Sequence, residues 1–224
     1  MKTHLSAVAL AAAIVGGGWW VAGQGTAPGA TIALPGAASA QEATTETEAV
    51  EITEMTLGAE DAPVEVIEYA SYTCPHCATF HEDVFPQLKE DYIDSGKVRF
   101  TYREVYFDKY GMWASLVARC GGEDRFFGIT DMIYDTQGEW SRAGSDAAIA
   151  DELRKIGRMA GLDNDQLESC LTDSAKLRAL VEWYQANAEE HNVRATPTFV
   201  IDGETRSNMS YAEFSDILDE RLGE

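Results

Sequence analysis

The sequence predicts an α/β fold in which two sheet-forming segments are separated by a block of helices. Three observations support this prediction: residues 64–105 have the pattern of strand, helix and strand, residues 198–222 have that of two strands and a helix, and no convincing strand signal lies between them. A βαβ unit and a ββα unit of this kind form one domain, at residues 55–109 and 194–224, interrupted by an all-helical insertion at residues 110–193.

The first unit begins with residues 64–70, an apolar, β-branched run that is typical of a buried strand. A helix is expected from Pro75, because the first helical position leaves its N–H unpaired and proline has none. Four apolar side chains then recur at helical spacing: Cys77, Phe80, Val84 and Leu88. Gly96 ends the helix, and residues 98–105 alternate as a second strand.

Helix boundaries are visible at two places in the insertion. Gly121 and Gly122 close a helix whose inner face includes Cys120. Asp163 and Gln166 have the spacing of a capping box for a later helix that carries Cys170.

The second unit begins with the apolar residues 198–201. Asp202-Gly203 is a two-residue turn that pairs them with a strand at residues 204–206. The last helix spans residues 211–222, with its apolar side chains on one face.

Two cysteines flank one turn of the first helix in the segment Cys74-Pro75-His76-Cys77. Cys74 is thereby placed at the helix N-cap, where backbone N–H groups and the positive end of the helix dipole favour a thiolate. A protonated His76 would add a second stabilising charge. Because a stabilised thiolate favours the reduced form, the Cys74–Cys77 disulfide is expected to be a strong oxidant.

Other chemistries fit this motif less well. A zinc site needs further ligands, whereas Cys120 and Cys170 are isolated and only His81 lies at a suitable distance. Haem attachment needs histidine where Ala78 stands. A structural disulfide across two intervening residues would be strained. The prediction is therefore redox chemistry without a metal, with the cysteine pair in place of a cofactor.

Residues 1–40 predict export. They contain one charged side chain, Lys2, then an apolar stretch from Leu5 to Ala22 and the small residues Ala38-Ser39-Ala40. This is the layout of a signal peptide, although the apolar stretch is also just long enough for a retained membrane anchor. Residues 41–54, rich in Ala, Thr and Glu, are expected to be a disordered lead-in.

The formal net charge of the chain is −21. Such a charge repels nucleic acid and anionic lipid, and no nucleic-acid partner is expected. An acidic surface that keeps the protein in solution accounts for most of this charge, so no cationic substrate is inferred from it.

Four segments in this order make the sequence resemble the DsbA family of thioredoxin-fold disulfide oxidoreductases. They are residues 57–64, residues 68–77 with the Cys-Pro-His-Cys motif, the helical insertion, and residues 195–199. The resemblance covers residues 55–224, and it implies a thioredoxin-like fold with an inserted helical domain.

The resemblance also implies roles for matching residues. Cys74 would be the exposed nucleophile and Cys77 the buried resolving thiol, while Pro197 would be a cis-proline in a loop that pairs with substrate. Thr196 would set the chemistry of that loop. Many relatives have Gly where this chain has Ala195, and oxidising relatives often have Val at position 196. Since Thr there also occurs in reducing and isomerising relatives, the direction of electron flow stays open.

The implied function is a periplasmic dithiol oxidase that donates the Cys74–Cys77 disulfide to newly exported, cysteine-containing proteins. A membrane partner of the DsbB type would reoxidise it. A reductase or isomerase of the same fold is an alternative, but no dimerisation domain is visible and a monomer is expected. A non-catalytic assembly factor that holds extended peptides by strand addition is an alternative of another class.

Glu68 is a further candidate for the site. Strand alternation places it with Val64 and Val66 on a face otherwise expected to be core, and relatives in the family commonly have an acid there. A buried carboxylate at this position is expected to relay a proton to Cys77. An ordinary solvated glutamate is the alternative.

Cys120 and Cys170 are the second cysteine pair, and both share helix faces with core residues. An oxidising compartment and an even cysteine count predict a structural disulfide between them. Two buried free thiols are the alternative.

Overall fold

The computed structural model describes residues 50–224. The signal peptide or anchor predicted at residues 1–40 and the lead-in up to residue 49 lie outside the described residues. At the end of the lead-in, the Thr53 carbonyl accepts a hydrogen bond from Arg119, and Glu54 forms an ion pair of 2.6 Å with Arg103. Across residues 50–224, no helix is long and apolar enough to cross a membrane.

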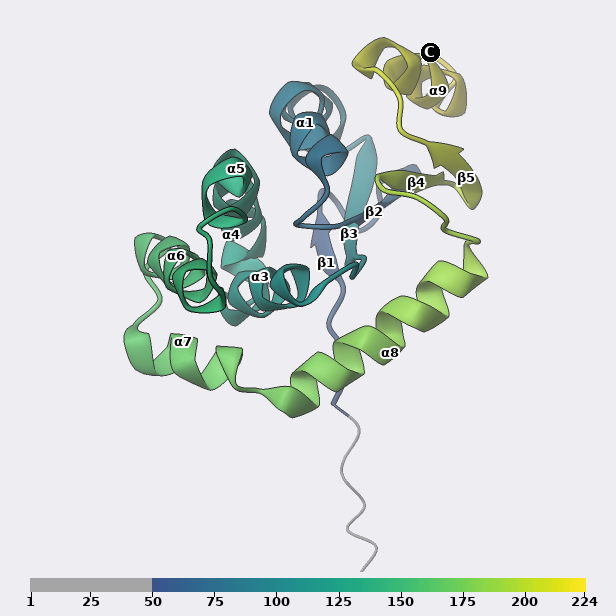
Figure 1. The fold of residues 1–224 in the computed structure, drawn as a ribbon. Coiled ribbons are helices and arrows are strands. Elements are labelled where there is room, and N and C mark those ends of the chain that lie inside the picture. Colours follow the sequence, from purple (N-terminus) through teal and green to yellow (C-terminus); the bar gives the residue numbers. More distant parts are fainter. Residues whose placement is uncertain (1–49) are drawn as a thin grey trace, which may run out of the picture. The chain divides into compact units, whose positions relative to one another are not determined.

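A five-stranded mixed sheet forms the centre of the fold, in the order β1-β3-β2-β4-β5 (Figure 1). The strands are β1 (Met55–Leu57), β2 (Val64–Ala70), β3 (Val98–Glu104), β4 (Thr198–Ile201) and β5 (Glu204–Ser207). β2 and β3 are parallel, and the other neighbouring pairs are antiparallel. The predicted α/β fold with a βαβ unit and a ββα unit is thus confirmed.

β1 is a strand that the sequence analysis missed. It is three residues long and pairs with β3, so that Met55 lies opposite Tyr102 and Leu57 opposite Phe100. So short a segment contains too little alternation to be recognised from sequence.

Between and after these strands lie the helices. They are α1 (Pro75–Asp83), α2 (Phe85–Leu88), the π-helix η1 (Lys89–Ile93), α3 (Lys109–Cys120), α4 (Glu123–Asp135), α5 (Gln137–Trp140), α6 (Asp146–Met159), α7 (Asn164–Leu171), α8 (Ser174–Glu190) and α9 (Tyr211–Leu222). α3 to α8 follow one another between β3 and β4, in the stretch for which an insertion is predicted, and Figure 1 shows α8 running from the far end of this stretch back toward β4.

The first helix is interrupted where the sequence analysis expected it to continue. α1 ends at Asp83 and α2 begins at Phe85, with Val84 between them. Pro86 explains the interruption, because proline has no N–H to bond the carbonyl of Glu82 and its ring crowds that carbonyl.

Both faces of β2 are buried except at Glu65. Val64 and Val66 belong to a large core that also contains side chains of α1, α2, α4 and α9. On the opposite face, Ile67 and Tyr69 pack with Val200 of β4 and with α8. Glu68 shares the parity of Val66, so its carboxylate lies on the side of the sheet that α1 covers.

A buried ion pair ties the insertion to the sheet. Arg119 of α3 donates two hydrogen bonds of 2.6 Å to the two carboxylate oxygens of Glu104 at the end of β3. Ser115 donates a third, of 2.9 Å. The side chains of Arg119 and Glu104 are 3% and 1% exposed, so loss of either partner would leave a buried charge and cost roughly 3–5 kcal/mol.

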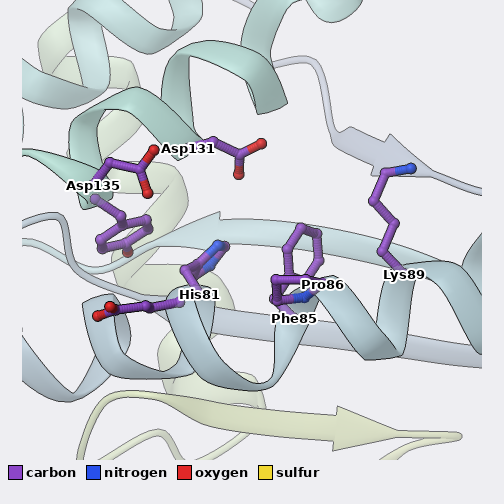
Figure 2. A pocket seen from close by; sticks show the side chains of 8 residues that line it. His81, Phe85, Pro86, Lys89, Asp131 and Asp135 are labelled. Carbon is purple, nitrogen blue, oxygen red and sulfur yellow. The ribbon is translucent and has the colours of Figure 1, made fainter.

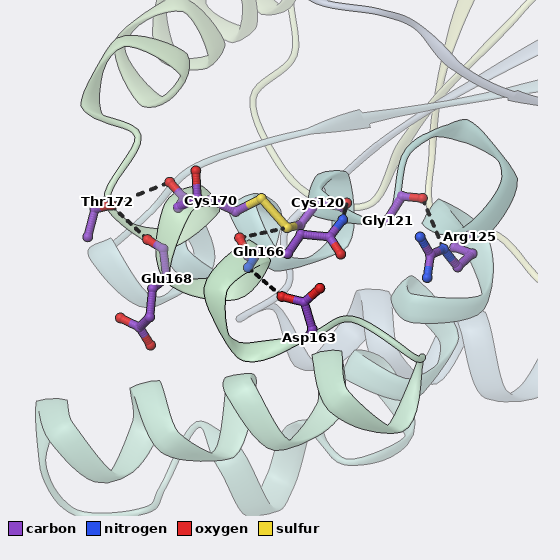
Figure 3. Close-up of a disulfide and its surroundings, with 9 residues drawn as sticks. Cys120, Gly121, Arg125, Asp163, Gln166, Glu168, Cys170 and Thr172 are labelled. Carbon is purple, nitrogen blue, oxygen red and sulfur yellow. Dashed lines mark hydrogen bonds between the residues drawn. A yellow bond between two sulfur atoms is a disulfide. The ribbon is translucent and has the colours of Figure 1, made fainter.

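A disulfide joins Cys120, at the end of α3, to Cys170 in α7 (Figure 3). Asp163 caps α7 by accepting from the backbone N–H of Gln166. The side chain of Gln166 does not return to the cap, as a capping box requires, but donates to the carbonyl of Cys120 at 3.1 Å. The predicted capping box is therefore half formed, because its glutamine stabilises the end of the neighbouring helix.

Candidate active site

Cys74 and Cys77 lie at the beginning of α1. Cys74 is the N-cap with extended backbone (φ −84°, ψ 119°), and Pro75 is the first helical residue. Cys77 is fully buried, whereas Cys74 keeps 8% of its surface exposed beside the exposed Pro75 and His76. Both cysteines are free thiols, so the structure corresponds to the reduced form. Cys74 is less exposed than the resemblance implied, but it is the one of the two that solvent reaches.

The surroundings of Cys74 lower the pKa of its thiol from 9.0 to about 5. A hydrogen bond from the Cys77 thiol is the largest cause, and burial acts against it. The side chain of Thr196 and the backbone N–H groups of Cys77 and His76 also lower the pKa. In the thiol form, the Cys74 side chain accepts no cap hydrogen bond among the described residues, so these N–H groups act on the thiolate once it forms.

The opposite holds for Cys77, whose pKa is raised well above its ordinary value. Burial is the largest cause, followed by the hydrogen bond to Cys74 and the negative charge of Glu68. At neutral pH the pair therefore consists of an accessible thiolate and a buried thiol that shares its proton with it.

The loop before β4 supplies the other side of the site. The Cys74 thiol donates to the Thr196 carbonyl across 3.4 Å, and the Thr196–Pro197 peptide bond is cis. The Thr196 hydroxyl is buried and has no hydrogen-bond partner within residues 50–224 while Cys74 is a thiol, so it is available to donate to the Cys74 thiolate. The fold thus brings Thr196, and with it the cis bond to Pro197, to the nucleophile.

His76 lies in the first turn with its side chain exposed. The part of His76 that lowers the pKa of Cys74 in this structure is its backbone N–H. A role for its imidazole stays a prediction.

Glu68 is fully buried beneath the cysteines and pairs with His81 of α1. Its Oε2 lies 2.9 Å from His81 Nε2, while its Oε1 has no hydrogen-bond partner in the described part of the chain. Sequence reasoning considered His81 only as a weak metal ligand. The spacing of Cys77 and His81, four residues apart on one helix, is the signal that places both side chains on the face that covers Glu68.

The segment before α1 is held by residues that the sequence analysis did not single out. Gln137 of α5 is buried and donates 2.9 Å hydrogen bonds to the carbonyls of both Tyr72 and Cys74. Asp108, at the start of α3, accepts a 2.7 Å bond from the Thr73 hydroxyl. No local pattern reveals these contacts, because the partners lie far apart in the sequence.

Comparisons with known proteins agree with this geometry. The sequence pattern of a family described as Thioredoxin matches residues 50–220. A putative protein-disulfide oxidoreductase of Rickettsia bellii is 32% identical over 172 residues, which are 76% of this chain and 65% of that protein. The chain thus spans less than two thirds of that relative. Disulfide bond formation protein D of Bacillus subtilis is 29% identical, over 74% of this chain and 76% of its own length.

Two solved structures have the same fold. The crystal structure of Wolbachia pipientis alpha-DsbA1 matches with a TM-score of 0.72 and 25% identity, covering 78% of this chain and 93% of that one. Oxidised BdbD from Bacillus subtilis matches with a TM-score of 0.64 and 26% identity, covering 76% of this chain and 94% of that one.

Proposed function

Because the chain belongs to the thioredoxin family and resembles the DsbA proteins, we propose that it is a thiol:disulfide oxidoreductase that donates its Cys74–Cys77 disulfide to exported proteins. The observation that carries the proposal is the unequal cysteine pair. The pKa of Cys74 is lowered to about 5 and that of Cys77 is raised, by the contacts that each thiol makes in the fold.

The low pKa of Cys74 supports donation rather than uptake of the disulfide. At pH 7 a thiol with a pKa of about 5 is almost fully ionised, whereas one with a pKa of 9.0 is not. This ionisation stabilises the reduced enzyme by roughly 3 kcal/mol, which makes the disulfide more oxidising by about 60 mV.

Exchange at this site takes two displacements. A substrate thiolate attacks Sγ of Cys74, the Cys74–Cys77 bond breaks, and its electron pair goes to Cys77, which takes up a proton. A second substrate thiolate then attacks the substrate sulfur of the mixed disulfide and releases Cys74 as a thiolate. Two substrate thiols become one disulfide, and the two electrons reside on the enzyme as a thiolate and a thiol.

The remaining candidates have supporting roles in this proposal. The loop at Thr196 and Pro197 would pair with an extended substrate beside Cys74, because it already contacts that sulfur. His76 would tune the thiolate from the exposed surface, and Glu68 would exchange the Cys77 proton. Cys120 and Cys170 would brace the insertion as a structural disulfide.

The cellular setting is part of the proposal. The layout of residues 1–40 supports export to the periplasm, either free or tethered by that segment. Reoxidation would fall to a membrane partner of the DsbB type, and the enzyme would act as a monomer on unfolded or newly exported proteins.

A net reductase or isomerase is the second candidate, and the Thr196 side chain is the observation that favours it. Its buried hydroxyl faces the same sulfur that must leave or attack in either direction. A non-catalytic peptide-binding factor is the third, and it predicts no turnover.

Equilibration with glutathione separates these candidates. The protein without residues 1–40 is brought to equilibrium with glutathione buffers, and the Cys74–Cys77 disulfide is quantified. We expect a reduction potential nearer to about −120 mV than to about −270 mV, the approximate values of the oxidant DsbA and of thioredoxin. A reduction potential near that of thioredoxin would mean that the protein acts as a reductase. If the oxidised protein forms a stoichiometric amount of disulfide in a reduced substrate protein, the non-catalytic peptide-binding factor is excluded.

A further inference from the structure

We propose that His81 connects the buried Cys77–Glu68 pair to a cavity between α1 and α4, through which the proton of Cys77 enters and leaves. The inference rests on thiol–disulfide exchange at Cys74 and Cys77, but on neither the direction nor the substrates proposed above.

A route of this kind is needed because both inner groups are sealed. Cys77 and Glu68 each have 0% of their surface exposed. Substrate bound to Cys74 would cover the opening on that side. A buried carboxylate alone can hold one proton, but it cannot exchange it with solvent between turnovers.

Glu68 and His81 offer two pairs of atoms for two transfers. Oε2 of Glu68 and Nε2 of His81 are 2.9 Å apart, a hydrogen-bond distance across which a proton can pass. The second atom of each group, Oε1 of Glu68 and Nδ1 of His81, is buried and has no partner among residues 50–224. Oε2 of Glu68 and Nε2 of His81 thus serve the transfer between the two groups. Oε1 of Glu68 remains free for the transfer to Cys77, and Nδ1 of His81 for the transfer from the cavity.

The cavity lies on the outer side of His81 and has a volume of about 310 Å³. Its lining consists of His81, Glu82, Phe85, Pro86, Lys89, Asp131, Tyr134 and Asp135. Figure 2 shows the His81 side chain projecting from α1 toward α4, which carries Asp131 and Asp135. Cys74, His76 and Thr196 are not part of this lining, so the cavity opens away from the nucleophile. It has room for water to deliver a proton.

Charged and titratable groups face His81 from each element around it. They are Glu68 on β2, Cys77 and Glu82 on α1, Lys89 on η1, Tyr102 on β3, and Asp131, Tyr134 and Asp135 on α4. Tyr134 stacks on the imidazole at 4.4 Å, and burial raises its pKa so far that it stays protonated. The pKa of Asp131 is raised, mainly by partial burial, while the charge of His81 acts in the opposite direction. Asp131 is therefore the group at the rim whose protonation responds to the imidazole.

The transfers balance with the electron flow of exchange. When the disulfide opens, the electron pair of the sulfur–sulfur bond goes to Cys77, and Glu68 gives Cys77 a proton through water or a movement of its carboxylate, because Oε1 bonds no group among residues 50–224. His81 gives its Nε2 proton to Glu68 and takes one at Nδ1 from cavity water, which reaches this atom through a small movement of the ring, because Nδ1 is covered in this structure. In the opposite direction every proton returns along the same atoms, and the electrons come only from thiols.

His81→Gln tests the route, since a glutamine amide can keep the hydrogen bond to Glu68 but cannot pass a proton on. The measurement is single-turnover reduction of the Cys74–Cys77 disulfide by dithiothreitol across mildly acidic to neutral pH. We expect a loss of roughly 10–100-fold, with an altered pH profile, because general acid–base groups contribute about 10²-fold or more. In His81→Ala, added imidazole should restore part of the rate by occupying the cavity.

His191→Gln is the matched control, because His191 also bonds a buried side chain, Tyr69 at 2.6 Å, but on the other face of the sheet. Its rates should stay within about two-fold of wild type. Folded His81 variants with wild-type rates and pH profile would overturn the proposal. If neither His81 variant folds, an Asp131→Asn, Asp135→Asn double variant decides, because these carboxylates at the exposed rim exchange protons with the water in the cavity. An unchanged rate and pH profile of this variant would reject the route. If the reduction potential of the wild-type disulfide lies near that of thioredoxin, the proposed oxidase direction is wrong. The His81 test remains valid, because it measures exchange in either direction.

Discussion

Two residues of the same type differ here because of what surrounds them. The pKa of Cys74 falls to about 5 because hydrogen-bond donors gather around its sulfur. The pKa of Cys77 rises because burial and the charge of Glu68 disfavour a second anion. The redox preference of the pair thus arises from individual contacts, and each can be tested by itself.

The stability of the reduced protein should depend on pH through Cys74. A pKa lowered from 9.0 to about 5 on folding stabilises the folded state fully above 9.0, and this stabilisation is lost as the pH falls through 5. Relative to Cys74→Ser, the free energy of unfolding of the reduced protein should fall by roughly 3.5 kcal/mol between about pH 8 and pH 5. Denaturant unfolding at each pH measures it. If the free energy of unfolding varies with pH in the same way in both proteins, the low pKa of Cys74 is contradicted.

His76→Ser should raise the pKa of Cys74 by about one unit, because the charge that a protonated imidazole would place beside the thiolate is lost. The pKa should nevertheless stay below 9.0, since Cys77, Thr196 and the backbone N–H groups still stabilise the thiolate. Ultraviolet titration of the thiolate in the reduced protein gives the midpoint. If the midpoint does not move, the contribution of residue 76 comes from its backbone alone.

At the scale of elements, the active site depends on how α1 is held at its first turn. Pro75 and the N-cap geometry begin the helix. The preceding segment is fixed from α5, since Gln137 bonds the carbonyls of Tyr72 and Cys74. The helical insertion therefore positions the nucleophile directly.

Gln137→Leu should lower the free energy of unfolding by roughly 1–3 kcal/mol, because it leaves the buried Tyr72 carbonyl without its donor. Urea unfolding measures the loss. Gln185→Leu, at an exposed position of α8, is the matched control and should change stability by less than about 0.5 kcal/mol. Equal effects of the two substitutions would mean that the Gln137 contacts do not hold the turn.

In the whole molecule, long-range contacts join the sheet, the insertion and the loop before β4. Thr196 contacts Cys74 from the second sheet-forming segment. Arg119 and Glu104 tie α3 to β3, and the Cys120–Cys170 disulfide spans 50 residues of the insertion.

Replacing both Cys120 and Cys170 by Ala should cost about 4 kcal/mol of unfolding free energy, the chain-entropy value for a loop of this length. Chemical unfolding of the oxidised protein and of the double variant gives the difference. Recovery of both cysteines of the unreduced wild type as alkylated free thiols would contradict the bridge.

Much of the fold follows from local patterns. The alternation in β2 and β3, the Asp202-Gly203 turn of the β4–β5 hairpin and the position of Pro75 all indicate their structures from a few neighbouring residues. β1 was missed because three residues are too few to show the alternation of apolar and polar side chains that identifies a strand. The break at Val84 was missed because the apolar spacing continues across the break. Pro86 is the local signal that could have predicted it.

The sequence by itself determined the reactive motif, since the placement of Cys74 before Pro75 and of Cys77 one turn later is a local property of a helix N-terminus. Only the tertiary structure decided what surrounds the two sulfurs. The Thr196 carbonyl, the Gln137 amide and the Glu68–His81 pair come from segments far apart in the chain. Such contacts have no signature in sequence spacing, because they depend on how packed elements meet rather than on the period of any one of them.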